Sequence, residues 1–262
     1  MSSLVVNRRT ALLFLGSGTG AILMSACGGN ASNTESSASP LASSSSASST
    51  SSSETPSSAS PSASPSRRNS FQRGFNVELN NADMEYTGEG YMYSTREKQG
   101  YGWPHPKRPQ EMSENSELGL YYSWAYASAG ISYAMKTGDD TYIKQSGMTE
   151  GDQKLFKSIA LLEETREGKY WEESGNFVYR LESDHPEKKG EEYSWPYQLQ
   201  MFHGDFYVRN GEVHEIPENT DGWGKIVYSA GTLKARYLDG AWQMEGFFEG
   251  IATNTVGKPF DK

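Results

Sequence analysis

The 262-residue sequence contains a single cysteine, Cys27, which rules out a disulfide framework, a zinc site built on cysteines and a redox pair within the chain. It also contains no apolar run long enough to span a bilayer as a helix. Basic residues are in the minority, with 24 Lys and Arg against 33 Asp and Glu, and the formal net charge is −9. Because phosphate recognition needs a positive surface, this balance disfavours a nucleic-acid-binding protein.

Motifs for catalysis and metal binding are missing as well. The four histidines are scattered, and no two have the His-x-x-x-His spacing that brings imidazoles together on a helix. Neither a Gly-x-Ser-x-Gly nucleophile motif nor a phosphate-binding glycine loop ending in Lys-Ser or Lys-Thr occurs. The sequence therefore predicts no catalytic residue, no metal ion and no cofactor.

The N-terminal residues have the features of a bacterial export signal. A positive region at Asn7–Thr10 is followed by the apolar stretches Ala11–Leu15 and Ala21–Met24. Met24–Cys27 resembles the lipobox, in which the cysteine thiol is diacylated and becomes the first residue of the mature chain; Met24 stands where that motif usually has leucine. This resemblance predicts a signal peptide over residues 1–26 and a lipid anchor on Cys27, with Sec and twin-arginine export both open.

A stretch poor in apolar residues follows the lipobox. Residues 31–66 contain 19 serines, four prolines and no aromatic residue, so they should form a disordered tether that starts at Cys27 and ends at residue 66. A flexible chain of this length typically reaches about 35 Å. It is either a bare spacer or a glycosylated stalk. With lipid on Cys27, the protein should stay on the extracytoplasmic face of the cell membrane.

The aromatic residues mark where the folded part begins. All six Trp, all 16 Tyr and nine of the ten Phe follow residue 67, and the 196 residues after the tether are enough for one sizeable core. Turn residues dominate the first part of this segment, so we expect an irregular lead-in over residues 67–100 and a single domain over residues 101–262.

Apolar spacing changes from helical to strand-like along the domain. Three helices are predicted: the first from Ser113 to Gly138, a short second after Asp139–Asp140, and a third from a capping box at Thr149 to Gly168. Strands follow, with a period of two over residues 177–182 and 193–201.

Two dipeptides predict tight hairpins. Asn210-Gly211 and Asp239-Gly240 suit type I′ turns, whose two central residues both need positive φ. Folding about the second turn pairs Tyr237 with Trp242 on a dry face. Helices followed by antiparallel strands indicate an α+β domain with the helices on one face of the sheet.

A set of short segments stands in a fixed order between residues 101 and 248: Pro104-His105-Pro106, Pro109, Ser116–Tyr122, Tyr133–Asp139, Glu167–Trp171 and Gly240–Trp242. Together they resemble a family of actinobacterial lipoproteins, defined only by a domain of unknown function within the nuclear-transport-factor-2-like superfamily. The resemblance implies a cone in which three N-terminal helices pack on a curved antiparallel sheet. Members often carry a cysteine pair at the start of the third helix; Ser146–Lys154 contains none, which excludes any role of that pair here.

Aromatic side chains supply the candidate site residues. They make up 31 of the 196 residues after the tether, which suits a small apolar ligand or the face of a sugar. The residues predicted to line a hollow between helices and sheet are Tyr126, Tyr133, Trp171, Trp195, Tyr197, Tyr237 and Trp242. Each of them fits ordinary core packing as well.

These observations favour a non-catalytic module, anchored to the membrane, that binds a small ligand or a protein of the cell envelope. Two alternatives stay open: an isomerase or dehydratase with an acid or base in the cone, as the superfamily resemblance implies, and a protein-interaction domain with a filled core. The hollow separates them, because a buried acid or histidine in it indicates an enzyme, an apolar cavity indicates a binding protein, and a solid core indicates an interaction domain.

Overall fold

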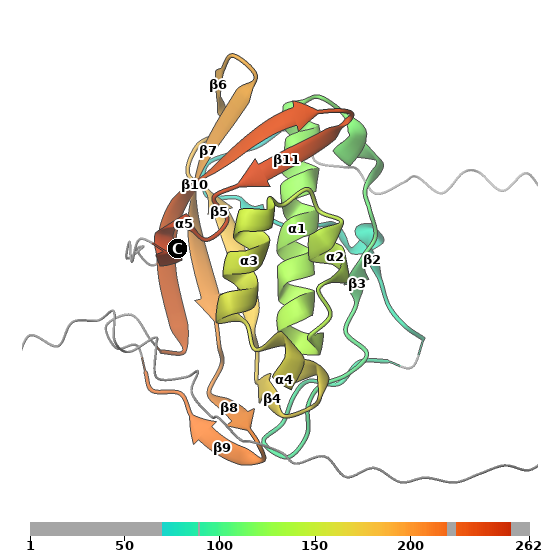
Figure 1. Ribbon diagram of the computed structural model, residues 1–262, viewed down its shortest axis with the longest axis vertical. Coiled ribbons are helices and arrows are strands. Elements are labelled where there is room, and N and C mark those ends of the chain that lie inside the picture. The colour runs from blue at the N-terminus through green and yellow to red at the C-terminus, as the bar shows by residue number, and fades with distance from the viewer. Residues whose placement is uncertain (1–69, 89, 219–223, 253–262) are drawn as a thin grey trace, which may run out of the picture. The chain divides into compact units, whose positions relative to one another are not determined.

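A computed structural model describes residues 70–88, 90–218 and 224–252 (Figure 1). The predicted signal peptide, the predicted lipid-anchor residue Cys27 and the serine-rich tract lie outside these residues. The described residues form a mixed α+β domain in which helices pack against an antiparallel sheet of six strands.

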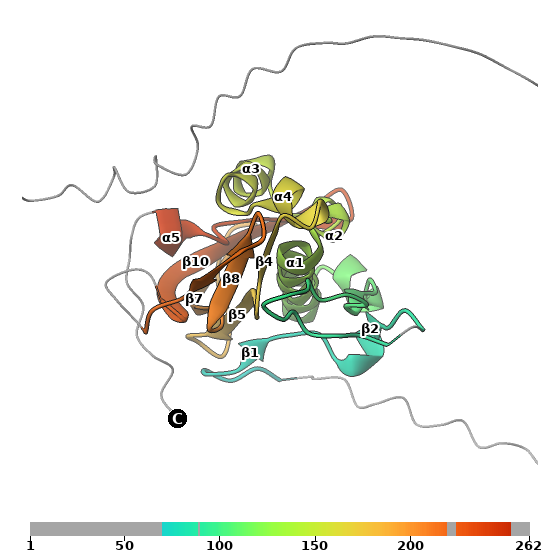
Figure 2. The ribbon, with the colours of Figure 1, turned by 90° about the horizontal axis from the view of Figure 1, so that it is seen from below.

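The longest helix, α1 (Glu117–Thr137), packs against the main sheet and against the shorter helices α2 (Thr141–Lys144) and α4 (Leu162–Arg166) (Figure 2). It begins after Ser116, whose side chain accepts a hydrogen bond from the Gly119 amide, and it ends at Gly138, where φ is 76°. A side chain would strain that left-handed conformation, so glycine ends the helix as predicted. The predicted start at Ser113 is replaced by a separate 3₁₀ turn, η3 (Gln110–Ser113).

Three shorter helices follow, α2 (Thr141–Lys144), α3 (Glu150–Ile159) and α4 (Leu162–Arg166). The predicted cap of α3 is confirmed, because Thr149 Oγ1 accepts a hydrogen bond from the Asp152 amide. The prediction of one helix as far as Gly168 is wrong, since Ala160 adopts an extended conformation with φ −97° and ψ 129°. The break lets both Ala160 and Leu162 pack into the main core.

The main sheet is antiparallel throughout, and its strands in spatial order are β1 (Asn76–Val77), β5 (Asn176–Leu181), β7 (Glu192–Phe202), β10 (Ile226–Leu238) and β11 (Ala241–Glu245). A sixth strand, β6 (Glu187–Lys189), pairs with β7. The predicted period of two is confirmed along β5, where Phe177, Tyr179 and Leu181 are buried and the residues between them are partly exposed. The buried side chains face α1 and form one wall of the core.

Both predicted hairpins are confirmed, with positive φ at all four turn residues, Asn210, Gly211, Asp239 and Gly240. The first turn joins β8 (Phe206–Arg209) to β9 (Glu212–Glu215), which form a second, three-stranded sheet with β4 (Tyr170–Glu172). The second turn joins β10 to β11 and pairs Tyr237 with Trp242, as predicted.

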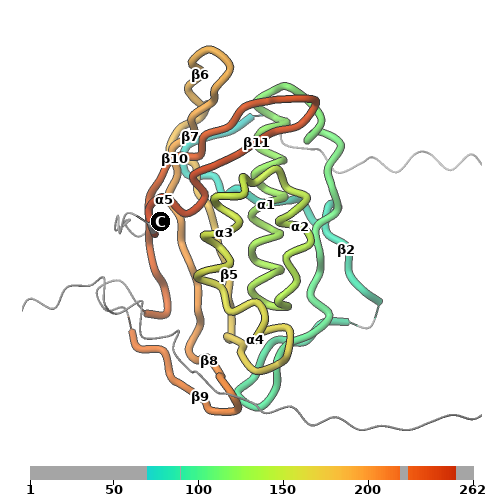
Figure 3. The backbone as a smooth tube through the Cα atoms, in the orientation of Figure 1, coloured from blue at the N-terminus to red at the C-terminus, as the bar shows by residue number. Residues whose placement is uncertain are grey.

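Part of the lead-in predicted as irregular over residues 67–100 packs with the domain. β1 forms an edge of the main sheet, and the 3₁₀ turn η2 (Asn81–Asp83) follows it. β2 (Met84–Glu85) pairs with β3 (His105–Pro106), and β3 contacts α1. Residues 86–88 and 90–104, which lie between β2 and β3 and are here called the lead-in loop, run beside α1 (Figure 3). Strands of two residues are too short to show a period, which explains why the sequence did not reveal them.

The core between α1 and the main sheet is aromatic. Trp124 of α1 exposes 0% of its surface, and its ring lies 5.6 Å from those of both Tyr179 and Tyr197. Phe247 and Phe248, which precede the last described helix α5 (Glu249–Ala252), are also fully buried. Side chains from both layers therefore pack directly against one another.

Candidate functional site

Four of the seven aromatic residues predicted to line a hollow lie in the core. Tyr126, Trp195, Tyr197 and Trp242 each expose 2% or less of their surface. The Trp195 ring lies 6.1 Å from that of Trp124, and its indole nitrogen donates a hydrogen bond of 3.0 Å to the carbonyl oxygen of Ser183. Side chains so enclosed hold the two layers together.

The other three lie in three different places. Trp171 packs with Phe206 and Val208 in a small cluster apart from the main core. Tyr237 is partly buried against the core, and its hydroxyl donates a hydrogen bond to the carbonyl oxygen of Ser113. Tyr133, on α1, lines a surface pocket. The predicted set is thus spread over several environments, and Tyr133 is its one member in this pocket.

The pocket lies between α1 and the lead-in loop and has a volume of about 250 Å³. We call it the aromatic pocket and define it by Tyr86, Tyr91, Tyr93, Trp103, Tyr133 and Lys136. Its rim is open, because Tyr86, Tyr91 and Tyr93 expose 57%, 43% and 63% of their surface.

One wall of the pocket comes from a single face of α1. Ala129, Ser132, Tyr133 and Lys136 all line the cavity, and positions three and four apart lie on the same side of a helix. Asn176, the first residue of β5, completes this wall. These four helix residues are only partly buried, whereas most of α1 is enclosed by its neighbours.

The opposite wall is a group of three rings that contact one another. The ring centres of Tyr91 and Tyr93 are 5.1 Å apart, and they lie 5.7 and 5.6 Å from that of Trp103. The Tyr91 hydroxyl donates a hydrogen bond of 2.9 Å to the Tyr93 hydroxyl, and this bond raises the pKa of Tyr91. Because the rings support each other, the two exposed tyrosines are held in place without a bound ligand.

Lys136 adds a basic group to the pocket. Its Nζ donates a hydrogen bond of 2.5 Å to Oδ1 of Asn176 and lies 4.4 Å from the centre of the Trp103 ring. Burial of the amine disfavours its charged form and lowers the pKa of Lys136 from 10.5 to about 8. Within the described residues, no carboxylate forms an ion pair with this amine. The pocket therefore holds a cation whose contacts are neutral.

Two polar atoms beside the pocket have no hydrogen-bond partner in the described part of the chain: Nε1 of Trp103 and Nδ1 of His105. Trp103 exposes only 7% of its surface, and the His105 ring is stacked on Tyr142 at 5.4 Å. Buried polar atoms are normally satisfied in folded proteins. This side of the domain therefore has unused hydrogen-bonding capacity.

The pocket was not predicted from the sequence, because its rim residues Tyr86, Tyr91 and Tyr93 belong to the segment predicted as irregular. A signal was present, since Tyr86, Tyr91, Tyr93, Tyr101 and Trp103 fall within 18 residues. Aromatic residues concentrated in a loop without an amphipathic period are more typical of a recognition surface than of a core.

A second cavity, of about 270 Å³, lies near the start of α1 and is lined by Glu78, Asn80, Tyr121 and Tyr122 among others. Its polar groups already bind one another. The Tyr121 hydroxyl donates to the carbonyl oxygen of Asn76 at 3.1 Å, and Asn80 Nδ2 donates to the Tyr122 hydroxyl at 3.1 Å. These internal contacts make it a weaker candidate for a ligand site.

A buried polar cluster links β4 to the residue that follows β7. The Glu172 carboxylate lies 3.0 Å from Nδ1 of His203 and accepts a short hydrogen bond from the Tyr170 hydroxyl. The side chains of His203 and Glu172 expose 11% and 6%. Burial, together with the neighbouring carboxylate, raises the pKa of Tyr170 and keeps its phenol neutral. We interpret the cluster as a tie between the two sheets, because its groups bind one another.

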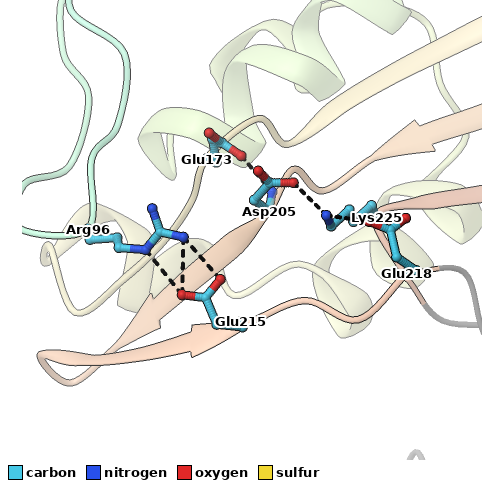
Figure 4. Close-up of polar contacts among 6 residues, drawn as sticks. All are labelled: Arg96, Glu173, Asp205, Glu215, Glu218 and Lys225. Atoms are coloured by element: carbon cyan, nitrogen blue, oxygen red, sulfur yellow. Dashed lines mark hydrogen bonds and ion pairs between the residues drawn. The ribbon is translucent and has the colours of Figure 1, made fainter.

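Charged side chains form a surface network around β8 and β9 (Figure 4). Arg96 of the lead-in loop contacts both carboxylate oxygens of Glu215 at 3.1 and 3.0 Å. Lys225 lies 2.9 Å from Asp205 and 2.6 Å from Glu218, and these two carboxylates raise its pKa. The network joins the lead-in loop and the start of β10 to the smaller sheet.

Neither a metal centre nor a membrane-spanning helix occurs in the described part of the chain. Its His, Cys, Asp and Glu side chains include no group of three or more that could hold a metal ion. No helix among these residues has both the length and the apolar character needed to cross a membrane.

Residues 89–247 match a family described as a family of unknown function (DUF6318). No curated protein and no solved structure matches the chain. The matched segment contains most of the aromatic pocket, including Tyr91, Trp103 and Lys136. The sequence was expected to contain a domain of unknown function, and this match confirms that part of the prediction. Since the match covers more than half of the 262 residues, the chain belongs to the DUF6318 family.

Proposed function

We propose that the protein is an exported lipoprotein whose folded domain binds a small ligand in the aromatic pocket. The observation that carries the proposal is the combination of an open aromatic rim with a partly buried amine. Tyr91 and Tyr93 expose 43% and 63% of their surface, and Lys136 lines the same cavity. Small-ligand sites commonly combine flat apolar side chains with a few polar groups that fix orientation. A small apolar molecule or a sugar fits this description.

The binding proposal can be tested with the mature chain and a small-molecule extract of the cell envelope. Native mass spectrometry after incubation would detect a compound that the protein retains. Tyr93→Ala should abolish retention, because it removes a rim side chain that is 63% exposed and contributes little to folding. Tyr101→Ala is the matched control, since Tyr101 is 42% exposed in the same loop but does not line the cavity. Retention that survives Tyr93→Ala would contradict the proposed site.

The location of the protein is proposed from the N-terminal residues. The lipobox-like Met24–Cys27 supports cleavage before Cys27 and diacylation of its thiol. Two or three acyl chains are enough for stable anchoring at the extracytoplasmic face of the cell membrane. The serine-rich residues 31–66 would then serve as a tether. A Cys27→Ala variant should leave the membrane fraction; if it still sedimented with membranes, the anchor would lie elsewhere.

For the fold we propose the cone of the nuclear-transport-factor-2-like superfamily, and for the family an actinobacterial lipoprotein origin. The support is the chain order, with α1, α2 and α3 followed by antiparallel strands that pack on α1. An experimental structure of this domain, superposed on members of the superfamily, would test the assignment. A shared order of β5, β7, β10 and β11 would support it, and a different strand order would overturn it.

A second candidate function is proton transfer in the same pocket. The pKa of Lys136, lowered to about 8 by burial, is close enough to neutrality for the amine to act as a base. An isomerase or dehydratase would convert the retained compound instead of returning it unchanged. Analysis of that compound after prolonged incubation separates the two functions, because a binding protein leaves its mass and structure unaltered. The third candidate is an interaction domain, and the filled core between α1 and the sheet supports it by the criterion stated for the hollow. Retention of a whole envelope protein, with no small molecule, would favour this candidate.

A further inference from the structure

We propose that the ligand of the aromatic pocket is a ring-bearing organic monoanion, a carboxylate on a single ring, whose charged group pairs with Lys136. This inference rests on the proposed function, because it names the chemistry of the ligand that the pocket takes. The support comes from the contacts of Lys136, from its unused N–H groups, and from the volume and charge of the pocket.

Among the described residues, the contacts of the Lys136 amine are with neutral groups. Its Nζ donates to the amide oxygen of Asn176 at 2.5 Å and covers the Trp103 ring at 4.4 Å. By contrast, Lys225 Nζ lies 2.9 and 2.6 Å from two carboxylates. A partly buried charge without a counter-ion is unfavourable, because its lost hydration is not replaced. A bound anion would supply the opposite charge that the described residues do not provide.

Among the described side chains that line the pocket, Lys136 has a polar group that donates hydrogen bonds and cannot accept them. An ammonium has three N–H donors, and Asn176 accepts one of them. The amide nitrogen of Asn176 donates in turn to Ser174 Oγ at 3.0 Å. The N–H groups of Lys136 that Asn176 does not accept favour a ligand group that only accepts, and an ionised carboxylate is such a group.

The charge of the pocket fits a single negative charge. Of the described residues that line the cavity, Lys136 is the one with a charged side chain. A phosphate monoester carries nearly two negative charges at neutral pH and would leave one of them without a partner in a partly buried site. A carboxylate brings one charge, which the ammonium balances.

The volume of the pocket fits one ring. Tyr91, Tyr93 and Trp103 pack against one another, with ring centres 5.1 to 5.7 Å apart, and form an aromatic wall of the cavity. The volume of about 250 Å³ is below the range of about 300–1,000 Å³ that is typical of sites for drug-sized ligands. A single aromatic or saturated ring with one acidic substituent is the ligand size that these dimensions accommodate.

Benzoate and benzamide are suitable probes, because they have the same ring and nearly the same shape but differ in charge. Each would be titrated into the mature full-length chain at pH 7, with tryptophan fluorescence as the readout. We expect benzoate to bind about tenfold more tightly than benzamide, which is the gain that a charge-assisted hydrogen bond typically gives. In Lys136→Gln this preference should disappear, and benzamide binding should be little changed.

The matched control is Lys98→Gln, which removes an exposed lysine of the lead-in loop. The Nζ of Lys98 lies 4.9 Å from the centre of the Tyr101 ring. This variant should keep the tenfold preference for benzoate. If Lys136→Gln does not fold, the pH dependence of the unchanged protein gives the same information. Raising the pH from 7 to 9.5 deprotonates Lys136, whose pKa is about 8, so benzoate binding should weaken by up to about tenfold, toward that of benzamide, while benzamide binding stays constant.

The other titratable groups facing the cavity are the phenols of Tyr86, Tyr91 and Tyr93 from the lead-in loop and of Tyr133 from α1, while β5 contributes the neutral Asn176. The pKa values of Tyr91 and Tyr133 are raised above 10, by the bond to Tyr93 and by burial respectively. Equal binding of benzoate and benzamide would overturn the anion proposal and leave the proposed pocket in place. If neither probe bound at millimolar concentration, and no extract compound depended on Tyr93, both proposals would fail.

Discussion

The amide oxygen of Asn176 accepts a hydrogen bond of 2.5 Å from Lys136 Nζ, and this contact joins the start of β5 to the last turn of α1. The same amine covers the Trp103 ring, so one side chain connects the helix, the main sheet and the lead-in loop. Burial of the amine disfavours its charged form. The stability of the domain should therefore depend on whether Lys136 is protonated.

We expect the contribution of Lys136 to the free energy of unfolding to become more favourable between pH 8 and 10.5. Its pKa is about 8 in the folded chain, against 10.5 for the free side chain. Between these values the unfolded chain binds more protons, so stability rises with pH, whereas below pH 8 both states are protonated and the penalty is constant. The full effect is on the order of 3 kcal/mol. Urea unfolding of the wild type and of Lys136→Met at pH 7.5 and 10 would measure it.

The comparison at equal pH cancels the titration of other groups, and Lys98→Met provides the control because Lys98 is exposed. The difference in unfolding free energy between wild type and Lys136→Met should change with pH, and that for Lys98→Met should not. Parallel pH profiles for wild type and Lys136→Met would show that the amine is solvated.

Two glycines should respond in opposite directions to the same substitution. Gly240 has φ +81° and open space around it, so Gly240→Ala strains the hairpin turn without a clash and should destabilise the fold by about 1 kcal/mol. Gly151 lies in the first turn of α3, where a Cβ would make an ordinary contact of 3.9 Å with Thr149 Oγ1. Gly151→Ala should therefore stabilise the fold by about 0.5–1 kcal/mol. Urea unfolding of both variants would measure the two changes in unfolding free energy. Changes of the same sign in both would contradict the prediction.

The elements that could be predicted from the sequence are those in which buried residues recur at a regular spacing. Phe177, Tyr179 and Leu181 alternate with partly exposed residues on β5, and a slip of one residue would turn all three toward the more exposed face. The hairpins were equally readable, because Asp239-Gly240 tolerates the positive φ that the turn requires. In each case the residues that determine the local structure are close together in the sequence.

The aromatic pocket could not be predicted in this way, since its walls come from separate segments. Nothing in the local pattern indicates that Tyr91 contacts Trp103 or that both face α1. Taken alone, Lys136 is a lysine in the last turn of a helix, a position where its charge suits the helix dipole in water. Its place in a pocket follows from the packing around the amine of Trp103 and Asn176, which come from other parts of the chain.

Trp242→Ala should lower the melting temperature by on the order of 10 °C. Trp242 exposes 2% of its surface, and its ring lies 5.2 Å from the rings of both Tyr193 and Tyr237. Its indole nitrogen also donates a hydrogen bond of 2.9 Å to the carbonyl oxygen of Glu114. Loss of a buried tryptophan typically costs 3–5 kcal/mol, and each kcal/mol lowers the melting temperature of a domain of this size by about 2–4 °C.

Trp171→Ala should have a smaller effect than Trp242→Ala in the same thermal melts. Trp171 is 9% exposed and packs in the small cluster with Phe206 and Val208, where the surrounding residues can close in after truncation. Neither tryptophan lines the aromatic pocket, so benzoate binding should survive both substitutions at temperatures where the variants are folded. Two variants with unchanged melting temperatures would mean that these side chains are not buried.

The buried Glu172–His203 pair should contribute more to stability than the exposed Arg96–Glu215 pair, although both have N···O distances of 3.0 Å. The side chains of the first pair expose 6% and 11%, and those of the second expose 47% and 67%. Interactions within a buried network are strengthened by the low local dielectric, whereas exposed pairs are weakened by water and salt. Double-mutant cycles with Glu172→Gln and His203→Ala, and with Arg96→Met and Glu215→Gln, give the coupling energies.

For the buried pair we expect a coupling of about 1–3 kcal/mol in urea unfolding at pH 7, changing little between low and high salt. For the exposed pair we expect less than about 1 kcal/mol at low salt, falling toward zero at about 1 M salt, where the screening length is near 3 Å. The contrast follows from solvent access, since the two pairs have the same distance. A salt-sensitive coupling at Glu172–His203 would show that water reaches this cluster, and the tie between β4 and the end of β7 would then be weaker than the geometry implies.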